Sequence, residues 1–390
     1  MVKGDYQDRA RGMLVGLAVG DALGAPIEFG YYSFDIEDMG DKVFHFYDSP
    51  RGNAGEWTDD TSMALCMADS LLQNGGYDSY DMMDRFFRWV KDGYRSHDGR
   101  PADDVGNQTR LEIVKYYRDP VRHKSDPKTE SAGNAPIMRL APIIIANTFP
   151  PKENKGKIPN KDLWPLADMA VLSCRETHNS IAAECVTDLF ATTLYSAILG
   201  YTKSDIISYA ERGSYRGIEE YDRFWVENVD QLVNRWRNKN DGENLKDLGG
   251  YIVDAFTIGM WGFVNSDSFE DGMKKVLRLG GDVDTNGAIY GQIAGAYYGY
   301  SAIPDEWKNK VYLSEELVAI ADDLLGMKEC PIIRTRFEDN EYFKKPDEEY
   351  EPLQLKKKDK DPQTDSDSEE PSNIQSLGDL LKERFNKQSK

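Results

Sequence analysis

Two runs of glycine, each repeating every fourth residue, constrain the fold of this chain more than any other feature. Their members are Gly12, Gly16, Gly20 and Gly24, then Gly287, Gly291, Gly295 and Gly299. At helical spacing each run lines one face of a helix, where every glycine costs about 1 kcal/mol relative to alanine. Because glycine is costly in a helix, its regular repetition predicts that these faces allow two backbones to approach closely at the centre of a helical bundle. The alternative is that ordinary core helices merely tolerate these glycines.

Helical periodicity also dominates the rest of the chain. In TDDTSMALCMADSLL, residues 58–72, Met63, Met67 and Leu71 share one helical face. Comparable patterns occupy residues 79–92, 109–118, 162–174, 180–200, 245–263, 268–278 and 314–325. Alternating apolar runs joined by hairpin turns are scarce. We therefore predict an all-α fold, with a short strand or two in its loops.

The charge of the chain excludes two classes of partner. The formal net charge is −20, whereas phosphate contacts with nucleic acids need clustered Lys and Arg. The same charge disfavours an anionic membrane surface. We expect no direct nucleic-acid binding and no membrane association. An anionic substrate would need local donors or metal ions to bind such a protein.

The N-terminal region and the cysteines favour a cytoplasmic protein. The apolar stretch GMLVGLAVG superficially resembles a signal peptide, but Asp5 and Asp8 fall in the segment that should be basic, and Asp21 ends the apolar run. The run is also shorter than the ~20 residues that a membrane span needs. The cysteines, which we interpret as reduced core thiols, form no Cys-x-x-Cys pair; they are Cys66, Cys174, Cys185 and Cys330.

The composition changes after residue 337. Residues 338–373 are charged, contain proline and are nearly free of aliphatic side chains, which predicts a disordered linker. Residues 374–387 place Ile374, Leu377 and Phe385 on one helical face, which predicts an amphipathic helix that docks a partner or the domain itself. A frayed tail without function is the alternative.

Acidic clusters stand at the starts of two predicted helices. Asp59 and Asp60 begin the helix after residue 58, and Asp282 and Asp284 precede the second glycine run. A capping role explains one aspartate at each helix start. If the two starts converge, however, four carboxylates repel one another unless cations hold them. Oxygen-only ligands select Mg²⁺, Mn²⁺ or Ca²⁺, and four shared carboxylates suit two ions. Two separate caps remain the alternative.

Several motifs occur in an order that resembles the ADP-ribosylglycohydrolase family. They are RARGMLVGLAVGDALGAPIEF, WTDDT, DVGNQT, SAGNAPIMR, ETHNSIAA and GGDVDTNGAIYGQIAGAYYG. The resemblance runs from about Gly12 to Asp305, and GDALGAPIEF, TDDT and GGDVDTNGAI together are its specific part. It implies a compact orthogonal helical bundle, with a catalytic domain over residues 1–337.

The resemblance also implies a site. Two Mg²⁺ or Mn²⁺ ions would bind Thr58, Asp59, Asp60, Asp282, Asp284 and Thr285. The catalytic acids would be Glu28 and Asp104, for which a surface acid and a helix cap are the alternatives. Substrate contacts would come from Ser131, Gly133, Asn134 and His178. Ala135 replaces a glycine that is common in the family's phosphate-binding loop, and a buried helix-capping role is the alternative for His178.

The reaction implied is hydrolysis of the glycosidic bond that joins ADP-ribose to a protein side chain, arginine in the first place. Other ADP-ribose conjugates, such as serine-linked ADP-ribose or O-acetyl-ADP-ribose, are an alternative substrate class. A non-catalytic ADP-ribose-binding protein, or an immunity protein that reverses or blocks a toxin, is a further alternative. The expected partner is accordingly an ADP-ribosylated protein or another ADP-ribose conjugate.

Overall fold

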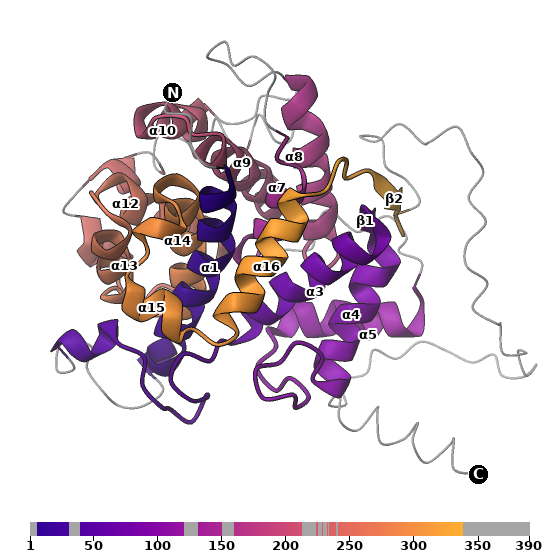
Figure 1. The fold of residues 1–390 in the computed structure, drawn as a ribbon, viewed down its shortest axis with the longest axis horizontal. Helices are drawn as coiled ribbons and strands as arrows, with labels where there is room; N and C mark the ends of the chain where they lie inside the picture. The colour runs from indigo at the N-terminus through magenta and orange to yellow at the C-terminus, as the bar shows by residue number, and fades with distance from the viewer. Residues whose placement is uncertain are drawn as a thin grey trace, which may run out of the picture. The chain divides into compact units, whose positions relative to one another are not determined.

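The computed structural model describes residues 6–30, 40–120, 132–149, 160–212, 224, 228, 232, 234–238 and 241–337. All of them belong to one unit, which spans residues 1–339 (Figure 1). The predicted linker, residues 338–373, and the predicted helix, residues 374–387, lie outside the described residues, as does Ser131.

Helices make up most of this unit. The α-helices are α1 (Tyr6–Gly24), α3 (Asp59–Asn74), α4 (Ser79–Asp92), α5 (Asn107–Arg118), α6 (Ala135–Met138), α7 (Ala141–Ala146), α8 (Asn160–Arg175), α9 (Ile181–Ile198), α10 (Lys203–Arg212), α12 (Ile252–Val264), α13 (Phe269–Leu277), α14 (Val283–Tyr298), α15 (Asp305–Lys310) and α16 (Ser314–Leu325). The 3₁₀ helices are η1 (Ala25–Gly30), η2 (Gly40–Phe44), η3 (Asp241–Leu245) and η4 (Tyr300–Ala302). Strands β1 (Tyr77–Asp78) and β2 (Ile332–Arg334) form a short parallel pair. The all-α prediction is confirmed.

Helices α1 and α14 pack against each other at the centre of the bundle (Figure 1). The glycine runs form the contact: a Cβ added to Gly287 would lie 2.6 Å from the carbonyl oxygen of Gly20. Real Cβ atoms essentially never come within 3.0 Å of another heavy atom. The predicted close approach is therefore confirmed, and it occurs between the two glycine-rich helices themselves.

The first glycine run lies within its helix as predicted, whereas the second extends one residue past its helix. Gly24 is the last residue of α1, and Gly299 lies one residue beyond α14 with φ of 88°. A Cβ on Gly24 would lie 2.8 Å from the carbonyl carbon of Val283, the first residue of α14. The last turn of α1 is thereby held against the first turn of α14, where the acidic residues stand.

The helix predicted for residues 245–263 begins later, at Ile252. Gly133 and Tyr251 form an isolated antiparallel bridge, and the backbone nitrogen of Ile252 donates to the carbonyl oxygen of Ala132 at 2.9 Å. This pairing with an upstream loop leaves residues 249–251 outside the helix. The two loops lie together beside the start of α14, because the backbone nitrogen of Asp282 donates to the carbonyl oxygen of Leu248 at 3.0 Å.

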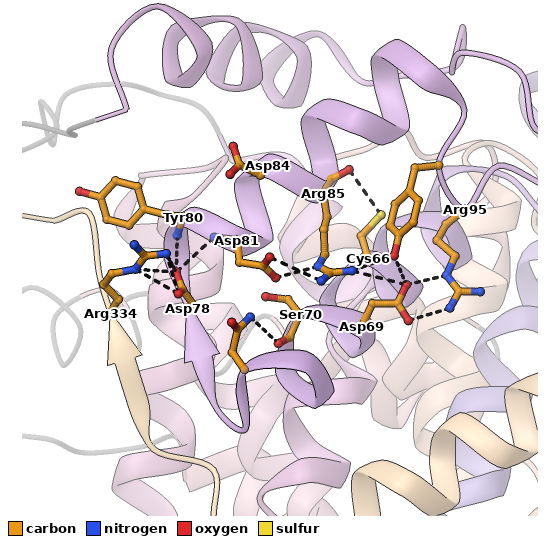
Figure 2. A network of polar contacts seen from close by, with 12 residues as sticks. Cys66, Asp69, Ser70, Asp78, Tyr80, Asp81, Asp84, Arg85, Arg95 and Arg334 are labelled. Carbon is orange, nitrogen blue, oxygen red and sulfur yellow. Dashed lines mark hydrogen bonds and ion pairs between the residues drawn. The ribbon is translucent and has the colours of Figure 1, made fainter. Parts of the chain in front are cut away.

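A polar network supports α3 and α4 on the side shown in Figure 2. Asp78 caps α4 and also accepts hydrogen bonds from the Arg334 guanidinium of β2. Farther along, Asp69 of α3 accepts two hydrogen bonds from Arg95, at 2.6 Å each, and Arg85 donates to Asp81 within α4. These contacts tie α3 to the loop after α4 and α4 to the C-terminal strand.

Candidate metal centre and catalytic acids

The first turns of α3 and α14 meet in the interior of the protein. One group of carboxylate oxygens within 4.8 Å of one another comes from Asp21, Asp60 and Asp284. A second group comes from Glu28, Asp282 and Asp284, so Asp284 belongs to both. The structure thus brings two segments more than 200 residues apart into one cluster.

Two hydroxyl groups complete this cluster. The Oγ1 atom of Thr58 lies 3.4 Å from Oδ2 of Asp284, and Oγ1 of Thr285 lies 3.5 Å from Oδ2 of Asp60. Each threonine belongs to one helix start and faces an acid of the other. Except for Asp59, the residues named as metal ligands therefore converge, through oxygen atoms alone.

Asp59 stands slightly apart from the cluster. It is half-buried and lines a cavity, and its oxygens belong to neither group of carboxylates. Burial, followed by the charges of Asp21 and Asp282, raises the pKa of its carboxyl to about 7. Asp59 therefore lies between the carboxylate cluster and the cavity.

Asp21 is a site residue that the sequence analysis did not identify. Its Oδ1 accepts hydrogen bonds from the backbone nitrogen and the hydroxyl of Thr58, at 2.8 and 2.7 Å. Its Oδ2 accepts the same pair from Thr61, at 2.9 and 2.7 Å. Asp21 therefore anchors the start of α3. Its position, a lone acid in the last turn of an apolar helix, was the available signal.

The centre concentrates negative charge away from water. Burial first, and then the charges of neighbouring carboxylates, raise the pKa of Asp60 and of Asp284 well above the ordinary value. The Oδ1 atom of Asp60 is fully buried and has no hydrogen-bond partner. Such an atom is costly unless a cation or a proton meets it. An all-oxygen donor set with an orphaned carboxylate oxygen fits Mg²⁺ or Mn²⁺.

Glu28 approaches the cluster from η1, directly after α1. Its side chain is buried, and Phe29 follows in a left-handed conformation with φ of 49°. The backbone nitrogen of Phe29 donates to the carbonyl oxygen of Gly281 at 2.8 Å, which fixes the η1 turn against the loop before α14. Burial raises the pKa of Glu28 to about 7, although the nearby Arg51 guanidinium lowers it.

Asp104 lies on an exposed loop at the edge of a cavity of about 560 Å³. Thr58 and Asp59 line the same cavity, so it opens directly onto the candidate metal centre. Arg51 also lines it and forms ion pairs with both Glu28 and Asp104. Arg51 escaped the sequence analysis because it stands in a loop that has no periodicity and no recognised motif.

Asn134, one of the residues named for substrate binding, lies beside Asp282. Asn134 donates from Nδ2 to Oδ2 of Asp282 at 2.8 Å, and its backbone nitrogen donates to the carbonyl oxygen of Gly250 at 2.9 Å. A Cβ on Gly133 would lie 2.7 Å from Nε2 of His178. His178 is 3% exposed, so it packs behind this loop rather than facing open solvent.

The sequence of the chain also matches a known family. The sequence model of the family described as ADP-ribosylglycohydrolase matches residues 3–331 of the chain. The chain belongs to the ADP-ribosylglycohydrolase family. It is an ADP-ribosylglycohydrolase by this match, and the resemblance found in its motifs is confirmed.

Individual relatives of this ADP-ribosylglycohydrolase extend over most of its length. It is 32% identical to the ADP-ribosylarginine hydrolase Tri1 of Pseudomonas putida (strain GB-1), covering 81% of this chain and 78% of the relative. It is 30% identical to the ADP-ribosyl-[dinitrogen reductase] glycohydrolase of Rhodospirillum rubrum, covering 79% and 92%. A solved structure titled "ADP-ribosylglycohydrolase-related protein complex" superposes with a TM-score of 0.64 at 33% identity, covering 83% and 99%.

Proposed function

We propose that this ADP-ribosylglycohydrolase is metal-dependent and removes ADP-ribose from arginine side chains of proteins. The observation that carries the proposal is the convergence of Asp60 and Asp284, with a buried Asp60 oxygen that has no partner. The arginine linkage is supported by the names of two similar proteins, both ADP-ribosylarginine hydrolases, at 32% and 33% identity.

Two Mg²⁺ or Mn²⁺ ions are the proposed cofactor. The proposed ligands are Thr58, Asp59, Asp60, Asp282, Asp284 and Thr285. When bound, such ions offset the repulsion among the carboxylates and lower the pKa of a bound water. Asp21 would keep Thr58 oriented toward them through its two hydrogen bonds to that residue.

The two catalytic acids have different surroundings, which suggests different roles. Glu28 lies within the carboxylate cluster, where it would accept a proton from the attacking water. Asp104 lies at the edge of the cavity, where its carboxylate would hold the substrate guanidinium while that group departs as a neutral guanidine. Gly133, Asn134 and Ser131 would bind the diphosphate on the Asp282 side, with His178 supporting their loop.

We propose that the enzyme is cytoplasmic. All four cysteines are buried free thiols, which suits a reducing compartment. Two segments, Tyr6–Gly30 and Ile181–Ile198, have the length and composition of a membrane span, but 94% and 89% of their apolar windows are buried inside the protein. Both are interpreted as core helices of the bundle.

A linkage-resolved assay tests the proposal. Arginine-linked and serine-linked ADP-ribosyl peptides would be incubated with the enzyme in Mg²⁺, in Mn²⁺ and after chelation, and free ADP-ribose would be measured. We expect release from the arginine peptide that chelation abolishes. Release from the serine peptide alone would contradict the arginine assignment, and full activity in chelator would contradict metal dependence.

A further inference from the structure

One guanidinium group joins the two proposed catalytic acids. Nη2 of Arg51 contacts Oε2 of Glu28, while Nη1 of the same side chain donates to Oδ2 of Asp104. The acids come from η1 and from the loop before α5, and 75 residues of chain separate them. Arg51 therefore connects two segments that the sequence leaves far apart.

The backbone beneath Arg51 is well fixed. Ser49 and Gly52 exchange two backbone hydrogen bonds, at 2.8 and 3.1 Å, and the backbone nitrogen of Arg51 donates to Oγ of Ser49 at 3.1 Å. A Cβ on Gly52 would lie 2.9 Å from Oε2 of Glu56, so the turn packs tightly against its neighbour. These contacts fix the backbone from which the Arg51 side chain extends toward the two acids.

The positive charge of Arg51 offsets the negative charges of Glu28 and Asp104. Glu28 shares its surroundings with the carboxylates of Asp282 and Asp284, which repel it. Asp104 has a side chain that is 47% exposed and would otherwise be free to turn toward water. A planar guanidinium can bind two carboxylates through separate nitrogens, whereas a lysine ammonium is a single point charge.

The position of Arg51 indicates which part of the substrate lies near it. Arg51 lines the same cavity as Asp59 and Asp104. The cavity lining comes from residues 50–51, 58–59, 62, 89, 96–98 and 100–104, whereas Asn134 contacts Asp282 elsewhere in the cluster. If the diphosphate lies at the Asn134 loop, the leaving group lies on the Arg51 side.

We infer that Arg51 is a positioning residue that holds Glu28 and Asp104 in their catalytic arrangement on the leaving-group side of the site. This inference rests on the proposed function, because it requires both acids to act on the substrate. Removing the guanidinium should lower kcat more than it raises KM, since the diphosphate side of the site remains intact.

The test compares Arg51→Ala, Arg51→Lys and a control, Arg118→Ala, on the arginine-linked peptide with saturating Mg²⁺. Arg118 is an exposed residue at the end of α5 and is not part of the cavity lining. We expect Arg51→Ala to lose about 100-fold in kcat, the scale of a misplaced catalytic group. Arg51→Lys should retain an intermediate kcat, and Arg118→Ala should behave like the wild type.

Chemical rescue separates positioning from a general effect on folding. Guanidinium chloride at millimolar, non-denaturing concentration should restore part of the kcat of Arg51→Ala and leave the wild type and Arg118→Ala unchanged. Wild-type kcat in Arg51→Ala would overturn the inference, and so would a loss that neither guanidinium nor lysine relieves. If Arg51→Ala does not fold, the kcat of Arg51→Lys decides: a wild-type value overturns the inference. An inactive wild-type enzyme would instead overturn the proposed function.

Discussion

Asp21 holds Thr58 through two hydrogen bonds to a single carboxylate oxygen, one from the threonine backbone nitrogen and one from its hydroxyl. Asp21 lies in the last turn of α1, and Thr58 precedes the first turn of α3. Since α1 packs on α14 through glycine, this contact joins the two helix starts on which the candidate metal centre is built.

Replacing Asp21 by asparagine tests that role. The amide keeps the shape of the side chain, but its nitrogen cannot accept a hydrogen bond. The backbone N–H and the hydroxyl of either Thr58 or Thr61 would therefore lose their acceptor. We expect Asp21→Asn to lower the free energy of unfolding by about 2–4 kcal/mol. Mn²⁺ affinity should fall by about 10- to 100-fold, as for other residues that orient metal ligands. Urea unfolding and calorimetric Mn²⁺ titration measure the two effects.

A matched control for that variant is Asp305→Asn, because the side chain of Asp305 is 84% exposed. We expect it to change neither the unfolding free energy nor the Mn²⁺ affinity. If Asp21→Asn matched this control in both measurements, the anchoring role of Asp21 would be wrong.

We expect the stability of the metal-free protein to fall as pH rises. Glu28 and Asp59 have pKa values of about 7 in the folded protein, against ordinary values of 4.5 and 3.8. Between those limits the metal-free folded state binds more protons than the unfolded state, so its stability falls as pH rises. Thermal melting in chelator should show Tm decreasing from about pH 5 to pH 7.

Saturating Mg²⁺ should suppress that decrease, because the cation takes the place of the bound protons. Melting curves in Mg²⁺ and in chelator, recorded over the same pH series, make the comparison. A metal-free protein whose Tm rises steadily from pH 5 to pH 7 would contradict the buried, mutually repelling arrangement of the acids.

The helix contact at Gly287 should not tolerate a methyl group. In Gly287→Ala the new Cβ would lie 2.6 Å from the carbonyl oxygen of Gly20, so α1 and α14 must separate. We expect a loss of about 1–3 kcal/mol in unfolding free energy from overpacking. Gly106→Ala is the control, because a Cβ there meets nothing within 4 Å and φ is −51°. Equal stability of the two variants would show that the glycines are merely tolerated.

The C-terminal part of the described chain is held by a buried ion pair. Arg336 donates to Glu176, and both side chains are almost fully buried. Arg336→Ala would leave the Glu176 charge without its cation, which costs about 3–5 kcal/mol. Urea unfolding measures the loss, with Arg100→Ala as the exposed control. A second change, Glu176→Gln, should recover part of the stability of Arg336→Ala, and failure to do so would argue against charge as the cause.

Periodicity predicted the fold well where the pattern was local. The predicted boundaries at 79–92 and 314–325 are those of α4 and α16. The error at residues 249–251 arose because their partners, around Gly133, lie more than a hundred residues upstream. A single-sequence pattern carries no signal for such long-range pairing.

The site was predictable only where residue types were unusual for their position. Asp282 and Asp284 stand out as paired acids before an apolar helix, and the structure places them together with Asp60. Asp21 and Arg51 are single charged residues in a helix and a loop, so nothing in their spacing shows what they contact. Their roles depend on how α1, α3 and the cavity loop meet in space.

The most direct test of the central claim is Mn²⁺ titration of the metal-free protein followed by electron paramagnetic resonance. Two ions roughly 3.5–4 Å apart should give a spin-coupled spectrum that saturates at two Mn²⁺ per chain and is lost in Asp284→Asn. A wild-type protein that shows only isolated Mn²⁺, or an Asp284→Asn variant with an unchanged coupled spectrum, would contradict the shared centre.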